Sequence, residues 1–202
     1  HLKVVEADRD MVAYLQEHYP ALQADDIISA NFLRVRLEDH FKGSFAIIGN
    51  YPYNISSQIL IKTIEYRDRV PEMAGMFQKE VADRVVAGPG SKVYGVIGVL
   101  VQAFYETEYL FSVGAGNFNP PPKVKSAVIR LVRREKPLVD DELWPVFKQV
   151  VKLSFGQRRK MLRNSLKSLL PAEALQEETF QLRPEQIELE QFVAIAKQVA
   201  NY

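Results

Sequence analysis

Apolar positions along the first two thirds of the chain change their spacing repeatedly. Short runs rich in β-branched and aromatic residues alternate with segments whose apolar residues recur at helical spacing. This alternation is typical of βαβ units that build a largely parallel sheet, so it predicts an α/β fold. We expect strands at residues 2–5, 26–29, 45–48, 73–77, 109–113 and 126–132, with helices at 10–19, 56–66, 79–87 and 94–104.

The last two expected strands are joined by residues 114–125, which show no helical pattern. Strands without a helical crossover between them pair antiparallel, so we expect a hairpin at the edge of the sheet. An α/β sheet with one reversed strand near its end resembles the Rossmann-like fold of methyltransferases that use S-adenosylmethionine.

The pattern changes after Arg134, where the strand-like runs stop. We interpret residues 136–141 as a linker. After it, apolar residues at helical spacing predict helices at 142–153, 157–170 and 189–200. We therefore expect two domains, an α/β domain over residues 1–135 and a small all-α domain over residues 136–202.

Composition narrows the class of protein. The chain of 202 residues is 47% hydrophobic and 25% charged, and no apolar run is long enough for a membrane span. It has no cysteine, which excludes disulfides, cysteine-ligated zinc and thiol chemistry. These features indicate a soluble globular protein, and the lack of cysteine is compatible with a reducing cytoplasm. We expect a cytoplasmic monomer that uses neither a membrane nor a metal.

The net charge of +1 is unevenly distributed. Between Leu143 and Ala172 the chain has no acidic residue and seven basic ones, which are Lys148, Lys152, Arg158, Arg159, Lys160, Arg163 and Lys167. Such a run is either a solvated helix face or a surface for phosphates, and its freedom from acids favours contact with nucleic acid.

Polar residues follow the first two expected strands. Glu6 and Ala7 come directly after the first strand, and a carboxylate at this place in a nucleotide-binding sheet is suited to ribose hydroxyls. Glu6 and Asp8 also favour the N-terminus of the next helix, so the signal is not specific. Asn31 and Phe32 follow the second strand, where an amide and an aromatic ring could address the adenine of a cofactor.

The most informative segment is Asn50-Tyr51-Pro52-Tyr53, which follows a buried strand. An adenine amine is a poor nucleophile with two N–H donors, so an enzyme that modifies it must hold acceptors around it. The Asn50 side-chain oxygen and a backbone carbonyl of Tyr51 or Pro52 could accept these protons and aim the nitrogen. Pro52 stiffens the turn, and Tyr53 could stack on the base. The competing interpretation is a simple strand-ending turn.

A second aromatic residue, Phe118, lies in the proline-rich loop between the two hairpin strands. It could press on the other face of the same base, unless it is an ordinary apolar residue packed in a stiff turn. Lys123 and Lys125 follow it and are candidates for RNA contact.

Together these motifs resemble ribosomal RNA adenine dimethyltransferases of the KsgA type, which methylate two adjacent adenines near the 3′ end of small-subunit (16S) rRNA. The resemblance spans nearly the whole chain and rests on residues 5–9 (VEADR), 49–56 (GNYPYNIS), 78–81 (QKEV), 87–91 (AGPGS), 118–124 (FNPPPKV), 155–160 (FGQRRK) and 162–166 (LRNSL). The basic C-terminal block is the most discriminating, because enzymes that dimethylate large-subunit rRNA share the catalytic motif without it.

The resemblance implies S-adenosylmethionine as cofactor, with Glu6 at its ribose, Asn50 at the reacting amine and small-subunit rRNA or the immature 30S particle as partner. The family has an acid where Asn31 stands, so the charge at the cofactor adenine is lost. The family's first strand and Gly-rich loop have no counterpart after His1. We therefore expect an upstream segment, and we expect the 202 residues alone to be inactive.

Two other functions remain open at this point. A DNA adenine methyltransferase would use the same catalytic loop but needs a region that reads base edges, and none is evident. A ribosome-assembly factor that binds RNA without turnover would have the same fold and would not need the Gly-rich loop.

Overall fold

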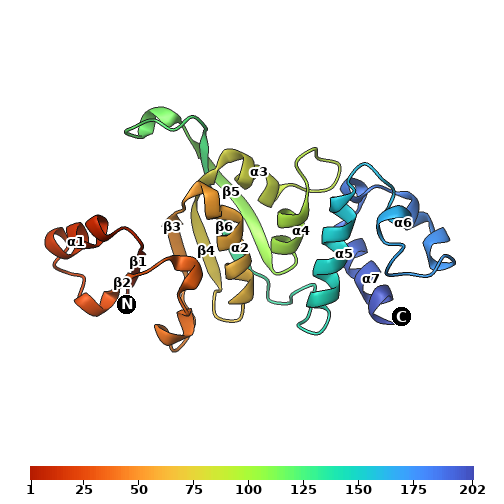
Figure 1. Ribbon diagram of the computed structural model, residues 1–202, viewed down its shortest axis with the longest axis horizontal. Helices are drawn as coiled ribbons and strands as arrows, with labels where there is room; N and C mark the ends of the chain where they lie inside the picture. Colours follow the sequence, from red (N-terminus) through yellow and green to blue (C-terminus); the bar gives the residue numbers. More distant parts are fainter. The chain divides into compact units, whose positions relative to one another are not determined.

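The computed structural model describes residues 1–202, which divide into two compact units, residues 1–44 and residues 45–202. Figure 1 colours the chain from the N-terminus to the C-terminus, and each unit is described by itself. None of the helices in either unit combines the length and the apolar character that crossing a bilayer requires.

The first unit is a small βαβ arrangement. Strands β1 (Val4–Glu6) and β2 (Ile27–Ser29) pair in parallel, and helix α1 (Arg9–His18) connects them. Asp8 caps α1 by accepting hydrogen bonds from the backbone amides of Asp10 and Met11. Short 3₁₀ turns η1 (Ala24–Asp26), η2 (Phe32–Arg34) and η3 (Leu37–Asp39) complete the unit.

The second unit contains a sheet of four strands in the order β3-β4-β6-β5. The strands are β3 (Ile47–Asn50), β4 (Glu72–Gln78), β5 (Tyr105–Val113) and β6 (Ser126–Arg133). β3 and β4 are parallel, whereas β6 is antiparallel to both β4 and β5. The expected hairpin is thus confirmed, and its second strand β6 is the single reversed strand, inserted between β4 and the edge strand β5.

Helices α2 (Ser56–Glu65), α3 (Lys79–Val86) and α4 (Val96–Gln102) pack against this sheet and one another, as Figure 1 shows. The strands alternate between buried and partly exposed residues, so one face of the sheet meets the helices. Buried on that face are Met73, Phe77, Ala127, Ile129 and Leu131.

The remaining helices are α5 (Trp144–Gly156), α6 (Leu162–Ser165) and α7 (Leu189–Ala200), with the 3₁₀ turns η6 (Ala174–Gln176), η7 (Glu178–Gln181) and η8 (Pro184–Gln186) between the last two. Their core is continuous with the sheet domain, since the Phe104 and Trp144 rings meet edge to face at 5.1 Å. The end of the sheet at Arg133 lies close to the expected boundary after residue 135, but the core crosses that position. The two-domain division stays a prediction.

The expected helix over residues 157–170 is wrong. α5 ends at Gly156, Gln157–Lys160 form a turn, and only Leu162–Ser165 are helical in this stretch. Glycine weakens the helix end, and the Leu162 amide donates to the Leu182 carbonyl (2.9 Å) instead of continuing a helix. Leu162 and Leu166 are fully buried, whereas Met161 is exposed, so the tertiary contact and not a helical repeat decides the backbone here.

Candidate functional site

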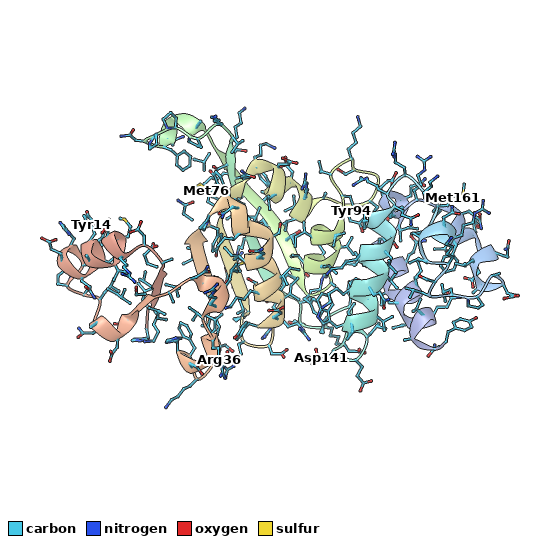
Figure 2. The ribbon with its side chains drawn as sticks, viewed as in Figure 1. Tyr14, Arg36, Met76, Tyr94, Asp141 and Met161 are labelled. Atoms are coloured by element: carbon cyan, nitrogen blue, oxygen red, sulfur yellow. The ribbon has the colours of Figure 1, made fainter.

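Asn50 is the last residue of β3 and lies at the carboxyl edge of the parallel strand pair. It pairs with Met76 of β4, which Figure 2 labels, and it is exposed. Its side chain makes no hydrogen bond within the protein. A rigid strand therefore presents an amide whose oxygen is available to a ligand.

Tyr51 anchors the loop that follows. Its ring lies over Gly49 and Gly75, where an added Cβ would clash with it, and it contacts Phe77 with ring centroids 4.9 Å apart. Its amide donates to the Met76 carbonyl (3.2 Å) and its hydroxyl to the Ala74 carbonyl (3.1 Å). Burial raises the pKa of Tyr51 well above its usual range, so the hydroxyl stays a donor. The Tyr51 side chain thus holds the loop rather than facing a ligand.

The Pro52 carbonyl is engaged within the protein. It accepts from the Ile55 amide (3.2 Å) and the Ser56 hydroxyl (3.2 Å), which form the short turn η4 (Tyr53–Ile55) leading into α2. The Tyr51 carbonyl has no such partner. Of the two backbone acceptors that the sequence suggests beside Asn50, the Tyr51 carbonyl is the one left available.

Tyr53 connects this loop to the base of the hairpin. Its hydroxyl lies 2.5 Å from the Ser126 Oγ, and Ser126 pairs with Val113 where the hairpin loop leaves the sheet. Phe118 lies in that loop, partly exposed and without a ring partner, just after the turn η5 (Ala115–Asn117). The fold therefore brings Tyr53 beside the root of the loop that carries Phe118. The sequence analysis did not identify Ser126, the first residue of β6, because nothing in its sequence context indicates a contact with Tyr53.

We expect Tyr53→Phe to lower the free energy of unfolding by about 1 kcal/mol, because the buried Ser126 hydroxyl loses its partner. Tyr53→Phe keeps the ring that would stack on a base, so methyl transfer should change little. Tyr53→Ala should remove both the hydrogen bond to Ser126 and the stacking. Urea titration and initial rates measure the two effects. Equal rates for the Phe and Ala variants would contradict a stacking role.

The first unit holds the residues expected at a cofactor. The Ala30 amide donates to the Glu6 carbonyl (2.9 Å), so Glu6 and Asn31 lie at the same edge of the β1-β2 pair. One carboxylate oxygen of Glu6 accepts from the Asp8 amide (2.8 Å), and the Asn31 side-chain oxygen accepts from the Leu33 amide (2.9 Å). Ala7 and Phe32 adjoin these two residues. A free oxygen of Glu6 and the NH₂ group of Asn31 remain for a ligand.

The expected RNA-binding residues divide into two groups. One group is exposed, with side chains that make no hydrogen bond or ion pair, and consists of Lys123, Lys125, Arg159, Lys160, Arg163 and Lys167. Arg158 differs, because its guanidinium donates to the backbone carbonyls of Tyr94 (2.6 Å) and Ser91 (3.2 Å). Arg159 and Arg163 do not share a helical face, because the helix expected over residues 157–170 is absent.

A hollow of about 1000 Å³ lies at the opposite edge of the four-stranded sheet, lined by residues that include Arg67, Glu72, Phe104 and Arg133. Its arginines are committed to the protein. Arg133 donates to the carbonyls of Arg67 (2.8 Å) and Asp68 (2.6 Å), and Arg67 pairs with Asp141. Because Asn50 ends β3 at the other edge, this hollow has no part in the candidate site.

Comparison with known proteins adds independent findings. A family model described as ribosomal RNA adenine dimethylase matches residues 1–200. The chain is 53% identical to ribosomal RNA small subunit methyltransferase A of Bacteroides thetaiotaomicron, over 98% of this chain and 74% of that protein. It is 49% identical to the protein of the same name from Flavobacterium johnsoniae, over 98% and 76%.

Two solved structures share the fold. A dimethyladenosine transferase from Plasmodium falciparum superposes with a TM-score of 0.82 at 19% identity, covering 98% of this chain and 81% of that one. The 23S rRNA methyltransferase ErmE superposes with a TM-score of 0.71 at 24% identity, covering 97% and 80%. These likenesses confirm the expected Rossmann-like methyltransferase architecture.

Proposed function

Because the chain belongs to the ribosomal RNA adenine dimethylase family, we propose that it transfers methyl groups from S-adenosylmethionine to N6 of two adjacent adenines near the 3′ end of small-subunit rRNA. The observation that supports this most directly is the loop after β3. There a free Asn50 amide and an unpartnered Tyr51 carbonyl stand side by side on a backbone anchored by a buried side chain.

The two acceptors match the two N–H bonds of an adenine amine. The Asn50 Oδ1 accepts one proton and the Tyr51 carbonyl oxygen accepts the other, which turns the nitrogen lone pair out of conjugation with the ring. S-adenosylmethionine supplies the electrophilic methyl group. Both acceptors strengthen their hydrogen bonds as positive charge grows on the nitrogen, so they stabilise the transition state more than the ground state.

Glu6, Asn31 and Phe32 fit the nucleoside part of this cofactor. The free Glu6 carboxylate oxygen suits a ribose hydroxyl, and the Phe32 ring suits an adenine face. The Asn31 oxygen accepts from the Leu33 amide and keeps a second lone pair, so Asn31 can offer the adenine ring both this acceptor and its NH₂ donors.

We propose small-subunit rRNA and not DNA as the substrate, because the matching family is described by its action on ribosomal RNA and the relatives are named as small-subunit rRNA methyltransferases. We further propose that the physiological substrate is the immature 30S particle, that the protein acts as a monomer and that it works in the cytoplasm. The exposed lysines beside the hairpin loop and the basic residues after α5 support an extended RNA contact.

The test uses the complete gene product, labelled S-adenosylmethionine, and unmethylated small-subunit particles or their RNA. We expect label in N6,N6-dimethyladenosine after nuclease digestion, confined to two adjacent positions. Large-subunit rRNA and duplex DNA serve as competing substrates. Label only in either competitor, or tight RNA binding without any label, would contradict the proposal and support one of the alternative functions.

A further inference from the structure

The loop between α3 and α4, residues 87–95, is held at two points by turns of the C-terminal region. Arg158 donates to the carbonyls of Tyr94 (2.6 Å) and Ser91 (3.2 Å), and the Gly90 amide donates to the Glu185 carbonyl (2.7 Å). Gly90 has φ of 82°, a left-handed conformation that favours glycine. Figure 2 labels Tyr94 at the end of this loop and Met161 just after the turn that carries Arg158.

Lys92 lies between the two residues that Arg158 holds. It is exposed and makes no hydrogen bond or ion pair. Arg159 and Lys160 follow Arg158 directly in a turn closed by the Lys160 amide and the Gln157 carbonyl (2.8 Å), and both side chains are likewise free. Although 67 residues separate Ser91 from Arg158, their contact holds the loop that carries Lys92 against the turn that continues into Arg159 and Lys160. We call these three residues the clamp patch.

The two chain segments that carry this patch are basic. Residues 84–105 and 143–172 contain no acidic residue, so neither segment carries a counter-charge. Burial raises the pKa of Tyr94, and the negative charges of Glu188 and Glu190 raise it further. The Tyr94 ring packs against Phe155 with ring centroids 5.7 Å apart, and the Arg158 guanidinium lies over the same Phe155 ring at 5.9 Å. Glu185 meets the loop through its own carbonyl at Gly90.

We infer that Lys92, Arg159 and Lys160 form one contact surface for the phosphate backbone of the substrate RNA, and that Arg158 positions this surface instead of binding RNA itself. The inference rests on the proposed function. Arg158 is suited to this role because its planar guanidinium spans two carbonyls at once, which a lysine ammonium cannot reproduce. Lys92 carries no signal in the sequence, because an isolated lysine in a loop has no basic neighbours along the chain.

The first experiment measures the affinity of the complete gene product for small-subunit rRNA over a range of salt concentrations. Lys92→Ala should weaken binding and reduce the slope of log K against log salt by about 0.7 to 0.9, the value for one lost phosphate contact. Lys197→Ala is the matched control. It removes another exposed lysine. Lys197 lies seven residues after Glu190 in α7, a rise of about 10 Å along the helix, so its removal should leave the slope unchanged.

The second experiment compares Arg158→Lys with Arg158→Ala. Arg158→Lys keeps the charge but loses the double attachment, so a positioning role predicts that both variants weaken RNA binding alike. It also predicts that Arg158→Ala costs little further affinity once Lys92 is already alanine, because the two residues act as one unit. Wild-type affinity and slope for Arg158→Lys would show instead that Arg158 binds phosphate directly and would overturn the positioning role.

The outcomes separate the two proposals. A wild-type protein that methylates small-subunit rRNA while Lys92→Ala keeps the full salt slope overturns the clamp patch alone. A wild-type protein that methylates no rRNA overturns the proposed function. Weaker binding of Lys92→Ala to the ribosomal particle, with unchanged binding to naked rRNA, would place a ribosomal protein on this surface and also overturn the inference. Because Lys92 is exposed and unbonded, its variant tests the patch even if Arg158 variants fail to fold.

Discussion

Asn50→Ala should reduce methyl transfer on the order of a hundredfold while leaving RNA affinity nearly unchanged, because the lost acceptor acts chiefly in the transition state. The side chain is exposed and makes no hydrogen bond in the protein, so its removal should also leave the free energy of unfolding unchanged. Single-turnover rates on small-subunit rRNA, RNA binding and urea unfolding together measure the three quantities.

The matched control is Asn201→Ala, which deletes the same group at an exposed site beyond the end of α7. It should keep the wild-type rate. A rate for Asn50→Ala within about threefold of wild type would be too small a loss for an oriented acceptor and would remove Asn50 from the mechanism. A parallel loss of stability would mean that the residue supports the fold instead.

Gly75→Ala should impair both folding and methyl transfer, although Gly75 touches no substrate. An added Cβ would lie 2.5 Å from the Gly49 carbonyl oxygen and closer still to the Tyr51 ring. Relieving this overlap costs about 1 to 3 kcal/mol of stability, as for other overpacked sites. The side chain that must move is the anchor of the catalytic loop, and displacement of reacting groups by about 1 Å can slow an enzyme on the order of a hundredfold.

Gly156→Ala provides the control for this change, since an added Cβ there meets no atom within 4 Å. Its stability and rate should match those of the wild type or exceed them slightly. The rate loss of Gly75→Ala should persist at low temperature, where the folded fraction is complete. Full activity of the folded variant would show that Tyr51 can shift without disturbing the position of Asn50.

The alternation of apolar runs was sufficient to predict the α/β class and the reversed strand β6, because strand and helix periods depend on which faces are buried. The Asn50–Tyr53 motif was also recognisable, since its chemistry depends on residue types that are adjacent in the chain. The first and last residues of the strands and helices were predicted less accurately than their order. β3 extends to Asn50, two residues beyond the expected end, because its pairing with Met76 of β4 continues to that point.

The sequence by itself thus determined the fold class and the family and indicated residues 50–53 as the candidate catalytic motif, because each depends on local spacing and residue identity. Only the tertiary structure decided that the Tyr51 side chain is an anchor, that its carbonyl is the free acceptor, and that Tyr53 meets Ser126. It also placed residues 157–160 in a turn where a helix was expected, and it directed the Arg158 guanidinium to the carbonyls of Ser91 and Tyr94. These features depend on hydrogen bonds to backbone and side-chain groups of segments that are distant in the chain, and a local sequence pattern does not indicate which of those groups lack a partner.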